Sequence, residues 1–407
     1  MDPLTKTTIE NLDNPEIRKV LILGGGFGGV KAALELAGQY KFQVTLISDQ
    51  INFRYYPMLY RTATGGSRDT SSIPLREIFS ERNIELVQGT ALTLDRAKKT
   101  VKTESGKGYP FDTLIVGLGS VTNYFGIKGL REYSYGIKSI EDAQQLRDHL
   151  HQQLLDEHQP DVNYIIVGGG PTGVELAGAL PGYIKHIMKK HGLPPRRFNV
   201  DIIEAEKRLL PRMSPRYSRA VSKRLRRLGV KQYLGQKVLA ETAQSLKISG
   251  KTLSSETVVW TAGVTTNPFM ATNGFKLDDR GKAIVNENLQ AEPDIYVIGD
   301  NASTQYSGMA QTALRDGSCV ASLLKGRASG KKVAAYQPKK PIYITPVGRR
   351  WAAVAWRRWQ FFGLFGWMMR RAAEFVGYHD LEVWWRASRR WMAEADSEES
   401  CPVCYDR

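Results

Sequence analysis

The sequence predicts an α/β fold with two parallel-sheet domains of the same kind and an amphipathic C-terminal region. Three observations carry this prediction. A short apolar run ends abruptly in glycines at residues 19–29, KVLILGGGFGG, and the pattern recurs at residues 164–173, YIIVGGGPTG. The third observation is the stretch 339–391, which is both basic and rich in tryptophan.

The first glycine run predicts a strand, a tight turn and a helix. Residues 20–23 are apolar without polar alternation, as in a buried parallel strand, and a helix is expected over 30–37. Gly24, Gly26 and Gly29 match G-x-G-x-x-G, whose glycines permit a sharp turn, close approach to a pyrophosphate and close helix packing. The helix amides then face the phosphates, so the pattern predicts a Rossmann-like dinucleotide site.

The next strand supplies the context that this motif needs. Residues 44–47 are apolar, and Asp49 follows two residues later, where it is expected to meet a ribose hydroxyl. The match is imperfect, because Ser48 occupies the place where the acidic residue is most often found.

The second glycine run has its acid in the expected place. Gly168, Gly170 and Gly173 repeat the motif, and Glu204 closes the paired strand at 200–203. A carboxylate there accepts hydrogen bonds from ribose hydroxyls and repels a 2′-phosphate, which favours NAD(H) over NADP(H).

Lys207 and Arg208 follow that acid closely and weaken the preference for NAD(H). The two motifs together imply two dinucleotides, most economically one bound flavin dinucleotide and one nicotinamide dinucleotide. The alternative is a duplicated scaffold with one inactive site.

The composition fits a globular protein with a strongly basic surface. The chain has 407 residues, 42% hydrophobic and 24% charged, with a net charge of +16. Such a charge suggests an anionic partner, either a membrane surface or nucleic acid, or serves solubility alone. Residues 1–17 are expected to form a flexible arm without signal-peptide character, and three cysteines are too few for a disulfide framework.

Further strands and helices follow from the hydrophobic pattern. Residues 84–90 and 100–103 are expected in a small antiparallel layer, and 111–120 returns to the parallel sheet. Helices are expected over 139–157, capped by Ser139, and over 214–228, which carries a basic, solvated face. Residues 52–66 lie beside a planar cofactor or in the core.

Two later runs point to cofactor contacts. The strand-to-glycine turn at 258–263 is expected over the nicotinamide. The strand at 295–300 presents Asp300 at the carboxyl edge of the sheet, where it is expected to accept from a flavin's ribityl hydroxyls. An N-cap on the next helix is its structural alternative, and the two roles are compatible. A helix over 309–324 follows, with Gln311 near its start.

These motifs together resemble one family. GGGFGG at Gly24, GGGPTGVELAG at Gly168, IEAEKRLLP at Ile203, VVWTAG at Val258, IGD at Ile298 and AQTA at Ala310 look like type II NADH dehydrogenases. These are single-subunit, non-proton-pumping NADH:quinone oxidoreductases of the two-dinucleotide-binding flavoprotein superfamily, with a glutathione-reductase-like fold. The resemblance spans residues 18–390.

The motifs and the resemblance together give candidate site residues, with no metal site. The FAD candidates are Gly24, Gly25, Gly26, Phe27, Gly28, Gly29, Ser48, Asp49, Ala91, Gly119, Asp300, Ala310 and Gln311. The NADH candidates are Gly168, Gly170, Pro171, Thr172, Gly173, Glu175, Glu204, Ala262 and Gly263. Glu175 and Gln311 are the catalytic candidates, although Glu175 has a role at the helix dipole as its alternative.

The resemblance also sets the expected domains. Residues 18–125 and 275–338 form a discontinuous FAD domain, 126–274 the NADH domain, 339–395 a membrane-anchoring and dimer region, and 396–407 a tail.

The C-terminal region predicts a membrane surface contact. Residues 339–391 hold eleven Lys and Arg against three Asp and Glu, and seven of the eight tryptophans. The apolar run 359–369, flanked by Arg357, Arg358, Arg370 and Arg371, has eleven residues, short of the roughly 20 that span a bilayer. It is expected to lie on an anionic membrane; nucleic acid binding and a buried dimer interface are the competing interpretations.

A membrane location implies a membrane quinone as electron acceptor. The resembled family admits quinone beside its Ala-Gln stretch, here Ala310 and Gln311, and usually has a second glutamine where this chain has Arg315. The resemblance further implies a homodimer on the cytoplasmic face of the cell membrane, without nucleic acid.

The expected reaction is ping-pong transfer of hydride from NADH to FAD and then of two electrons to quinone, with helix amides near Gln311 stabilising the reduced flavin. Sulfide:quinone oxidoreductases and disulfide reductases need a cysteine pair near the flavin, which Cys319 and the tail pair Cys401 and Cys404 do not obviously supply.

Two competing functions stay open at the level of sequence. One is an enzyme of the same superfamily that passes its electrons to oxygen or to a protein, and the second is a flavoprotein that binds a partner and senses redox state. His149, His151 and His158 are expected to be solvated rather than metal ligands.

Overall fold

A computed structural model describes residues 17–156, 162–194 and 196–393. Contacts divide the chain into two compact units, each assembled from three separate stretches. Unit 1 takes its described residues from Met1–Phe53, Pro74–Val121 and Thr265–Pro341, and unit 2 from Arg54–Ile73, Thr122–Val264 and Ile342–Arg407. Arg54–Ile73, which the sequence boundaries put in the first domain, therefore groups with unit 2. The arm expected over residues 1–17 lies outside the description except for Ile17, and the expected tail lies outside it entirely.

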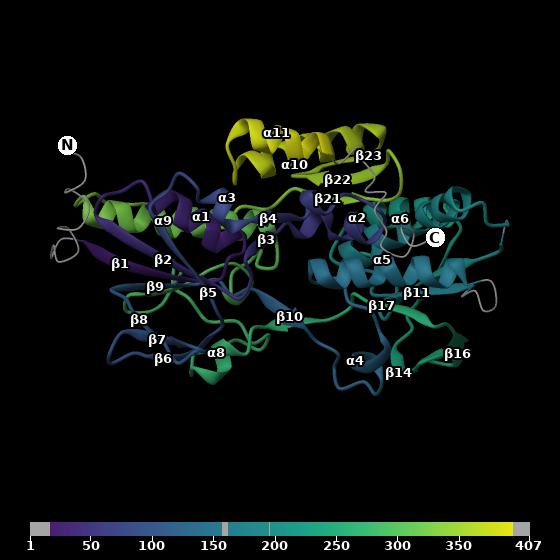
Figure 1. Ribbon diagram of the computed structural model, residues 1–407, viewed down its shortest axis with the longest axis horizontal. Coiled ribbons are helices and arrows are strands. Elements are labelled where there is room, and N and C mark those ends of the chain that lie inside the picture. The colour runs from purple at the N-terminus through teal and green to yellow at the C-terminus, as the bar shows by residue number, and fades with distance from the viewer. Residues whose placement is uncertain (1–16, 157–161, 195, 394–407) are drawn as a thin grey trace, which may run out of the picture. The chain divides into compact units, whose positions relative to one another are not determined.

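Unit 1 is built on a six-stranded sheet of order β19-β20-β9-β1-β2-β5 (Figure 1). All neighbours are parallel except β19, which runs antiparallel to β20. The strands are β1 (Arg18–Leu23), β2 (Phe42–Ser48), β5 (Ile84–Gln88), β9 (Thr113–Val116), β19 (Gln290–Glu292) and β20 (Ile295–Val297).

The two faces of this sheet are covered differently. Leu21 and Leu23 pack in one apolar cluster with Val101 and Tyr109 of an antiparallel layer. Ile22, which points the other way, lies under helix α1, as the alternation of side chains along a strand requires. The remaining elements of unit 1 are β6 (Ala91–Asp95), β7 (Thr100–Thr103), β8 (Gly108–Pro110), α1 (Phe27–Leu36), α3 (Leu75–Ile78), α8 (Phe269–Thr272), η4 (Gly299–Asn301) and α9 (Ala310–Ala328).

The prediction that residues 84–90 belong to the antiparallel layer is wrong. Strand β5 pairs in parallel with β2, with Val44 opposite Ile84 and Ser48 opposite Gln88. It is the edge strand of the main sheet, so its residues are only partly buried. Partial burial gives an edge strand the polar alternation of a layer with one solvated face.

Unit 2 repeats this plan. A parallel sheet of order β13-β12-β11-β17 has α5, α6 and α7 packed in one apolar cluster and an antiparallel layer, β14-β15-β16, in another. The elements are α5 (Ile140–Leu155), β11 (Asn163–Val167), α6 (Pro171–Lys190), β12 (Asn199–Glu204), α7 (Pro215–Arg227), β13 (Val230–Leu234), β14 (Val238–Thr242), β15 (Ser245–Ile248), β16 (Lys251–Ser254) and β17 (Thr257–Trp260). Ser139 caps α5 in a capping box with Asp142, as predicted.

The C-terminal region adds a three-stranded antiparallel sheet and two helices to unit 2 (Figure 1). These are β21 (Tyr343–Pro346), β22 (Ala352–Trp356), β23 (Trp359–Gly363), α10 (Leu364–His379) and α11 (Trp384–Ala393). The apolar run 359–369 is thus divided between β23 and the first turns of α10. Among the described residues, no helix is both long and apolar enough to cross a membrane.

Short elements complete the described chain. They are β3 (Asn52–Arg54), η2 (Tyr56–Met58), α2 (Leu59–Ala63), η3 (Arg68–Thr70), β4 (Ser72–Pro74), β10 (Ser120–Thr122), α4 (Leu130–Tyr133) and β18 (Val264–Thr266). The chain passes from one unit to the other within β3, β4, β10 and β18, and again between Pro341 and Ile342.

The expectation of solvated histidines on α5 is wrong for two of the three. His151 is buried, with its Nε2 2.8 Å from the Tyr183 hydroxyl, and His149 Nε2 lies 2.9 Å from Thr257 Oγ1. Burial lowers the pKa of each to about 4, so both are neutral structural groups. His158 lies outside the described residues.

Glu241 on β14 predicts a pH-dependent stability. Its side chain is 4% exposed, and burial raises its pKa to about 8. The folded protein holds this proton that the unfolded chain releases near pH 4.5, so stability falls as the pH rises from 4.5 to about 8. Glu241→Gln is expected to raise the free energy of unfolding at pH 9 by roughly 2 kcal/mol or more, relative to its effect at pH 5, in urea titrations. An equal effect at both pH values would contradict this.

Candidate functional site

The glycine turn of unit 1 has the geometry of a phosphate cradle. Gly24 has φ +107°, and a β-carbon on it would lie 2.3 Å from the Gly117 carbonyl oxygen. A β-carbon on Gly29 would lie 2.0 Å from the Gly24 carbonyl oxygen, so neither position accepts a side chain. Gly26, in contrast, has no atom within 4 Å of that position. The first and third glycines of the turn are therefore enclosed by backbone, whereas the second leaves space for a pyrophosphate.

Helix α1 starts at this turn with the polarity that an anion requires. No side chain caps it, and its first turn contains no acidic residue. Its amides and the positive end of its dipole are therefore available to a phosphate. Phe27 packs edge-to-face on Phe53 at 4.8 Å between ring centroids, which fixes the start of the helix.

Ser48 lies at the end of β2 beside the same turn. A β-carbon on Gly25 would lie 2.7 Å from Ser48 Oγ, and the Ser48 side chain is buried. Asp49 follows on the surface with its carboxylate 3.4 Å from Gln50 Nε2. A hydroxyl thus occupies the usual position of the acid, and the carboxylate lies one residue further out.

Two loops of unit 1 are joined at the carboxyl edge of its sheet. Asn301 Oδ1 accepts a hydrogen bond from the Gly119 amide at 2.7 Å, and Asn301 Nδ2 donates one to the Gly119 carbonyl at 2.8 Å. Next to it, the Ser120 hydroxyl donates to Asp300 Oδ2 at 2.9 Å. Asp300 lies within the short helix η4, whose N-cap is Ile298, and it does not cap α9, whose N-cap is Met309. The N-cap alternative for Asp300 is therefore wrong.

Helix α9 packs tightly against α1. β-Carbons on Gly28 and Gly317 would lie 3.1 Å from the Ala313 carbonyl and 2.3 Å from the Gly28 carbonyl, respectively. Ala310 and Gln311 form the first turn of α9, which no side chain caps. Ala91, in contrast, lies in the apolar cluster on the other face of the sheet.

Arg315 has a structural partner one turn later on α9. Its Nη1 donates to the Lys339 carbonyl at 2.9 Å. The residue at the position of the second glutamine therefore ties the segment after α9 back onto the helix.

The glycine turn of unit 2 reproduces that of unit 1. Gly168 has φ +117°, and a β-carbon on it would lie 2.9 Å from the Ala262 Cα. A β-carbon on Gly173 would lie 1.9 Å from the Gly168 carbonyl oxygen, whereas Gly170 is open. Helix α6 begins with the exposed residues Pro171 and Thr172 and again has no side-chain cap and no acid in its first turn.

Glu204 is held at the end of β12 beside this turn. Its Oε2 accepts the Gly169 amide at 2.7 Å, and its Oε1 accepts the Glu206 amide at 2.8 Å. Arg208 turns away, because its guanidinium donates to the carbonyls of Met213 and Pro211. Of the two basic residues that weakened the preference for NAD(H), only Lys207 stays exposed.

The turn after β17 closes on the same side of unit 2. A β-carbon on Gly263 would lie 2.2 Å from the Asn123 carbonyl oxygen. The Trp260 Nε1 donates to that same carbonyl at 2.9 Å. Unit 2 thus brings Gly168, Glu204, Ala262 and Gly263 to one edge of its sheet.

Glu175 lies one turn into α6, in an unusual setting. The side chain is partly buried, and burial raises its pKa to about 8, with the charge of Arg370 opposing and that of Glu374 adding to the rise. Burial raises the pKa of Tyr60 on α2 to about 12, and the charge of Glu175 adds to this rise. Glu175 is therefore a carboxyl group that binds or releases a proton near neutral pH.

The prediction that Arg370 contacts the membrane surface is wrong. It was expected to face lipid, but it is 6% exposed and its Nη2 lies 2.5 Å from Glu374 Oε1, with Met58 Sδ at 3.4 Å. The spacing of four residues between Arg370 and Glu374 was the available signal for this ion pair. Asn301 was missed too, and its only signal was a polar residue directly after the strand-ending Gly-Asp.

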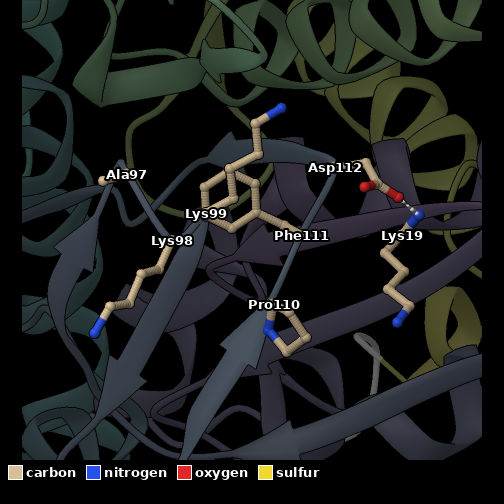
Figure 2. A pocket seen from close by; sticks show the side chains of 7 residues that line it. All are labelled: Lys19, Ala97, Lys98, Lys99, Pro110, Phe111 and Asp112. Carbon is tan, nitrogen blue, oxygen red and sulfur yellow. Dashed lines mark hydrogen bonds between the residues drawn. The ribbon is translucent and has the colours of Figure 1, made fainter.

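An open pocket elsewhere on unit 1 does not belong to the candidate site. Figure 2 shows Lys19, Lys98 and Lys99 around it, with the Lys19 amide bonded to Asp112 Oδ2 at 2.7 Å. Lys99 is paired with Asp294. The pocket lies at the amino ends of β1 and β9, whereas ligands of parallel sheets bind at the carboxyl ends.

The described residues contain no group of three or more His, Cys, Asp or Glu that could hold a metal ion. Cys319 on α9 is a free cysteine. Cys401 and Cys404 lie outside the described residues.

Residues 18–317 match the pyridine nucleotide-disulphide oxidoreductase family. The chain is 30% identical to the type II NADH:quinone oxidoreductase Ndh of Mycobacterium tuberculosis over 80% of this chain and 76% of that protein. It is 28% identical to the type II NADH:quinone oxidoreductase of Staphylococcus saprophyticus over 70% and 74%. The fold resembles NDH2 from Plasmodium falciparum in complex with NADH, with TM-score 0.82, 18% identity and coverage of 93% and 97%.

Proposed function

Because the chain belongs to the type II NADH:quinone oxidoreductases of the pyridine nucleotide-disulphide oxidoreductase family, we propose that it holds FAD in unit 1, binds NADH in unit 2 and reduces a membrane quinone. The observation that carries the proposal is the pair of matching turns, each closed by its first and third glycines and open at its second.

Unit 1 fits the bound flavin dinucleotide. The open space at Gly26 and the uncapped start of α1 suit a pyrophosphate, and Asp300 with Ser120 suits ribityl hydroxyls. Ser48 and Asp49 then face the adenosine ribose. When bound, the flavin supplies the chemistry that accepts a hydride and passes on two electrons.

Unit 2 fits the nicotinamide dinucleotide that comes and goes. Glu204 is pre-positioned by two backbone amides to accept ribose hydroxyls, and the turn at Ala262 and Gly263 offers backbone to the nicotinamide half. Glu175 supplies a proton-exchanging carboxyl group to the reduction of quinone, since its pKa of about 8 lets it do so at neutral pH. Gln311 acts through the first turn of α9, whose amides favour negative charge on the flavin.

The C-terminal region supplies the proposed membrane contact. Large apolar side chains of α10 and α11 are exposed, including Phe365 at 56%, Met368 at 55%, Trp384 at 70% and Trp385 at 51%. Such a face suits peripheral binding at an interface rather than water. The proposal includes attachment to the cytoplasmic face of the cell membrane and a homodimer.

The test is stepwise reduction of the purified protein in mild detergent. NADH is expected to bleach the flavin absorbance, and a short-chain quinone is expected to restore it and start turnover. Bleaching that only oxygen or a protein acceptor reverses would refute quinone as the acceptor, and absence of bleaching would refute the pairing of two nucleotide sites. Extraction of the bound nucleotide identifies it as FAD or another flavin.

Glu204 gives a separate prediction about nucleotide choice. Glu204→Gln is expected to reduce the ratio of kcat/KM for NADH over NADPH by about 10-fold or more, because the charge that repels a 2′-phosphate is removed. The matched control is Glu206→Gln, two residues later, whose side chain is exposed. An unchanged ratio in Glu204→Gln would contradict the assignment.

A further inference from the structure

The loop between β10 and α4 contains a turn whose sequence and backbone conformation disagree. The Ile127 amide donates to the Tyr124 carbonyl at 3.0 Å, which closes a β-turn. Its two central residues both have positive φ, +52° for Phe125 and +66° for Gly126. Turns of this kind favour Asn-Gly or Gly-Gly, because a bulky side chain in the left-handed region is strained. The chain therefore keeps a phenylalanine here at a cost in backbone conformation.

Hydrogen bonds fix this loop on the turn that follows β17. The Asn123 amide donates to the Gly263 carbonyl at 3.0 Å, and the Asn123 carbonyl accepts a hydrogen bond from Trp260 Nε1 at 2.9 Å. Asn123 Oδ1 accepts the Phe125 amide at 2.8 Å. All of these residues belong to unit 2. The position of Phe125 relative to Gly263 is thus set within one unit.

The ring of Phe125 packs on that turn and is open to solvent. A β-carbon on Gly263 would lie 2.6 Å from Phe125 Cε2, so the ring lies closely against the Gly263 backbone. It also meets Trp260 edge-to-face at 6.3 Å between ring centroids. Phe125 is nevertheless 60% exposed. Most of an apolar ring is therefore presented to solvent beside the turn proposed to hold the nicotinamide half of NADH.

Packing on Gly263 and Trp260 does not account for an aromatic ring that is both strained and largely exposed, whereas a ligand that covers the ring does. We propose that Phe125 is an NADH-binding residue, whose exposed ring contacts the nicotinamide half of the dinucleotide. An aromatic ring suits the planar nicotinamide. The inference rests on the proposed binding of NADH in unit 2, and it adds a side-chain contact that the glycine motifs do not supply.

The test removes the ring and relieves the backbone in one substitution. Phe125→Asn places before Gly126 the residue that such a turn favours. The probes are NAD⁺, which binds without reducing a flavin, and ADP, which lacks the nicotinamide half. In the full-length protein, calorimetry is expected to show a dissociation constant for NAD⁺ raised about tenfold, as for the loss of one aromatic contact, and an unchanged constant for ADP. The melting temperature is expected to stay at or above that of the wild type.

Two control variants separate the ring from the strain. Phe125→Tyr keeps both the aromatic ring and the strained backbone, and it is expected to keep the wild-type affinity for NAD⁺. Arg350→Gly relieves the backbone at another exposed residue of unit 2, which has φ +51°, and it is expected to leave the binding of both probes unchanged.

Unchanged affinity for NAD⁺ in Phe125→Asn would overturn the proposal. Equal weakening of NAD⁺ and ADP would overturn it too, because the substitution would then disturb the whole site. A lower melting temperature in both Phe125→Asn and Phe125→Gly would show that the ring is kept for packing. Absence of NAD⁺ binding in the wild type would instead refute the proposed nucleotide site itself, so the two failures are distinct.

Discussion

Replacing Gly173 with alanine is expected to lower kcat/KM for NADH by at least about 100-fold while the flavin content stays unchanged. The new β-carbon would lie 1.9 Å from the Gly168 carbonyl oxygen and 2.7 Å from Thr261 Oγ1. Helix α6 must then shift away from β11, and the space for the pyrophosphate opens. The flavin is proposed to bind in the other unit, so its binding is not affected. Stopped-flow reduction by NADH, with flavin absorbance as the measure of content, checks both parts.

Gly182→Ala is the matched control on the same helix. Gly182 has no atom within 4 Å of the β-carbon position, so alanine there is expected to leave NADH kinetics unchanged and to stabilise α6 by about 0.5–1 kcal/mol. Normal NADH kinetics in Gly173→Ala would show that the second turn does not hold the nucleotide.

Replacing Arg370 with methionine is expected to cost about 3–5 kcal/mol in the free energy of unfolding at pH 7, because Glu374 loses its direct buried partner. The penalty is expected to shrink at lower pH, where the stranded carboxyl group takes up a proton. Denaturant titrations at pH 5 and pH 7 measure both effects.

Two further variants test this loss at Arg370. Arg389→Met changes an exposed arginine of α11 and is expected to have little effect. The double variant Arg370→Met with Glu374→Leu is expected to recover much of the stability, because apolar residues replace the whole pair. Equal stability of Arg370→Met and the wild type would contradict the ion pair.

The nucleotide turns were predictable because their signals are local. Gly24 and Gly168 need positive φ, and Gly29 and Gly173 admit no β-carbon, so each motif carries its own geometric reason within six residues. Their placement in a strand, a turn and a helix is confirmed in both units. The position of Glu204 beside the second turn was predictable because it directly follows the apolar residues of the paired strand, and its role toward the nucleotide stays a prediction.

The surroundings of Glu175 were not predictable, because they depend on contacts between distant segments. Arginines beside an aromatic and apolar run have the same composition whether they face lipid or a buried glutamate, and only packing against Met58 shows that Arg370 faces inward. His151 was misjudged for the same reason. His151 lies on a helix that is polar in sequence, but its ring is buried and bonds to the Tyr183 hydroxyl of α6.

The interleaved composition of the two units constrains how the chain matures during synthesis. Arg390 donates a hydrogen bond to the backbone carbonyl of Asp69, and the Tyr378 hydroxyl donates to the backbone carbonyl of Thr70. More than 300 residues separate the two partners of each bond. Unit 2 therefore cannot finish folding until α11 has left the ribosome. Its first stretch, Arg54–Ile73, is synthesised much earlier and lacks these partners until then. Such late closure of long-range contacts slows folding and prolongs the exposure of apolar surface on the nascent chain.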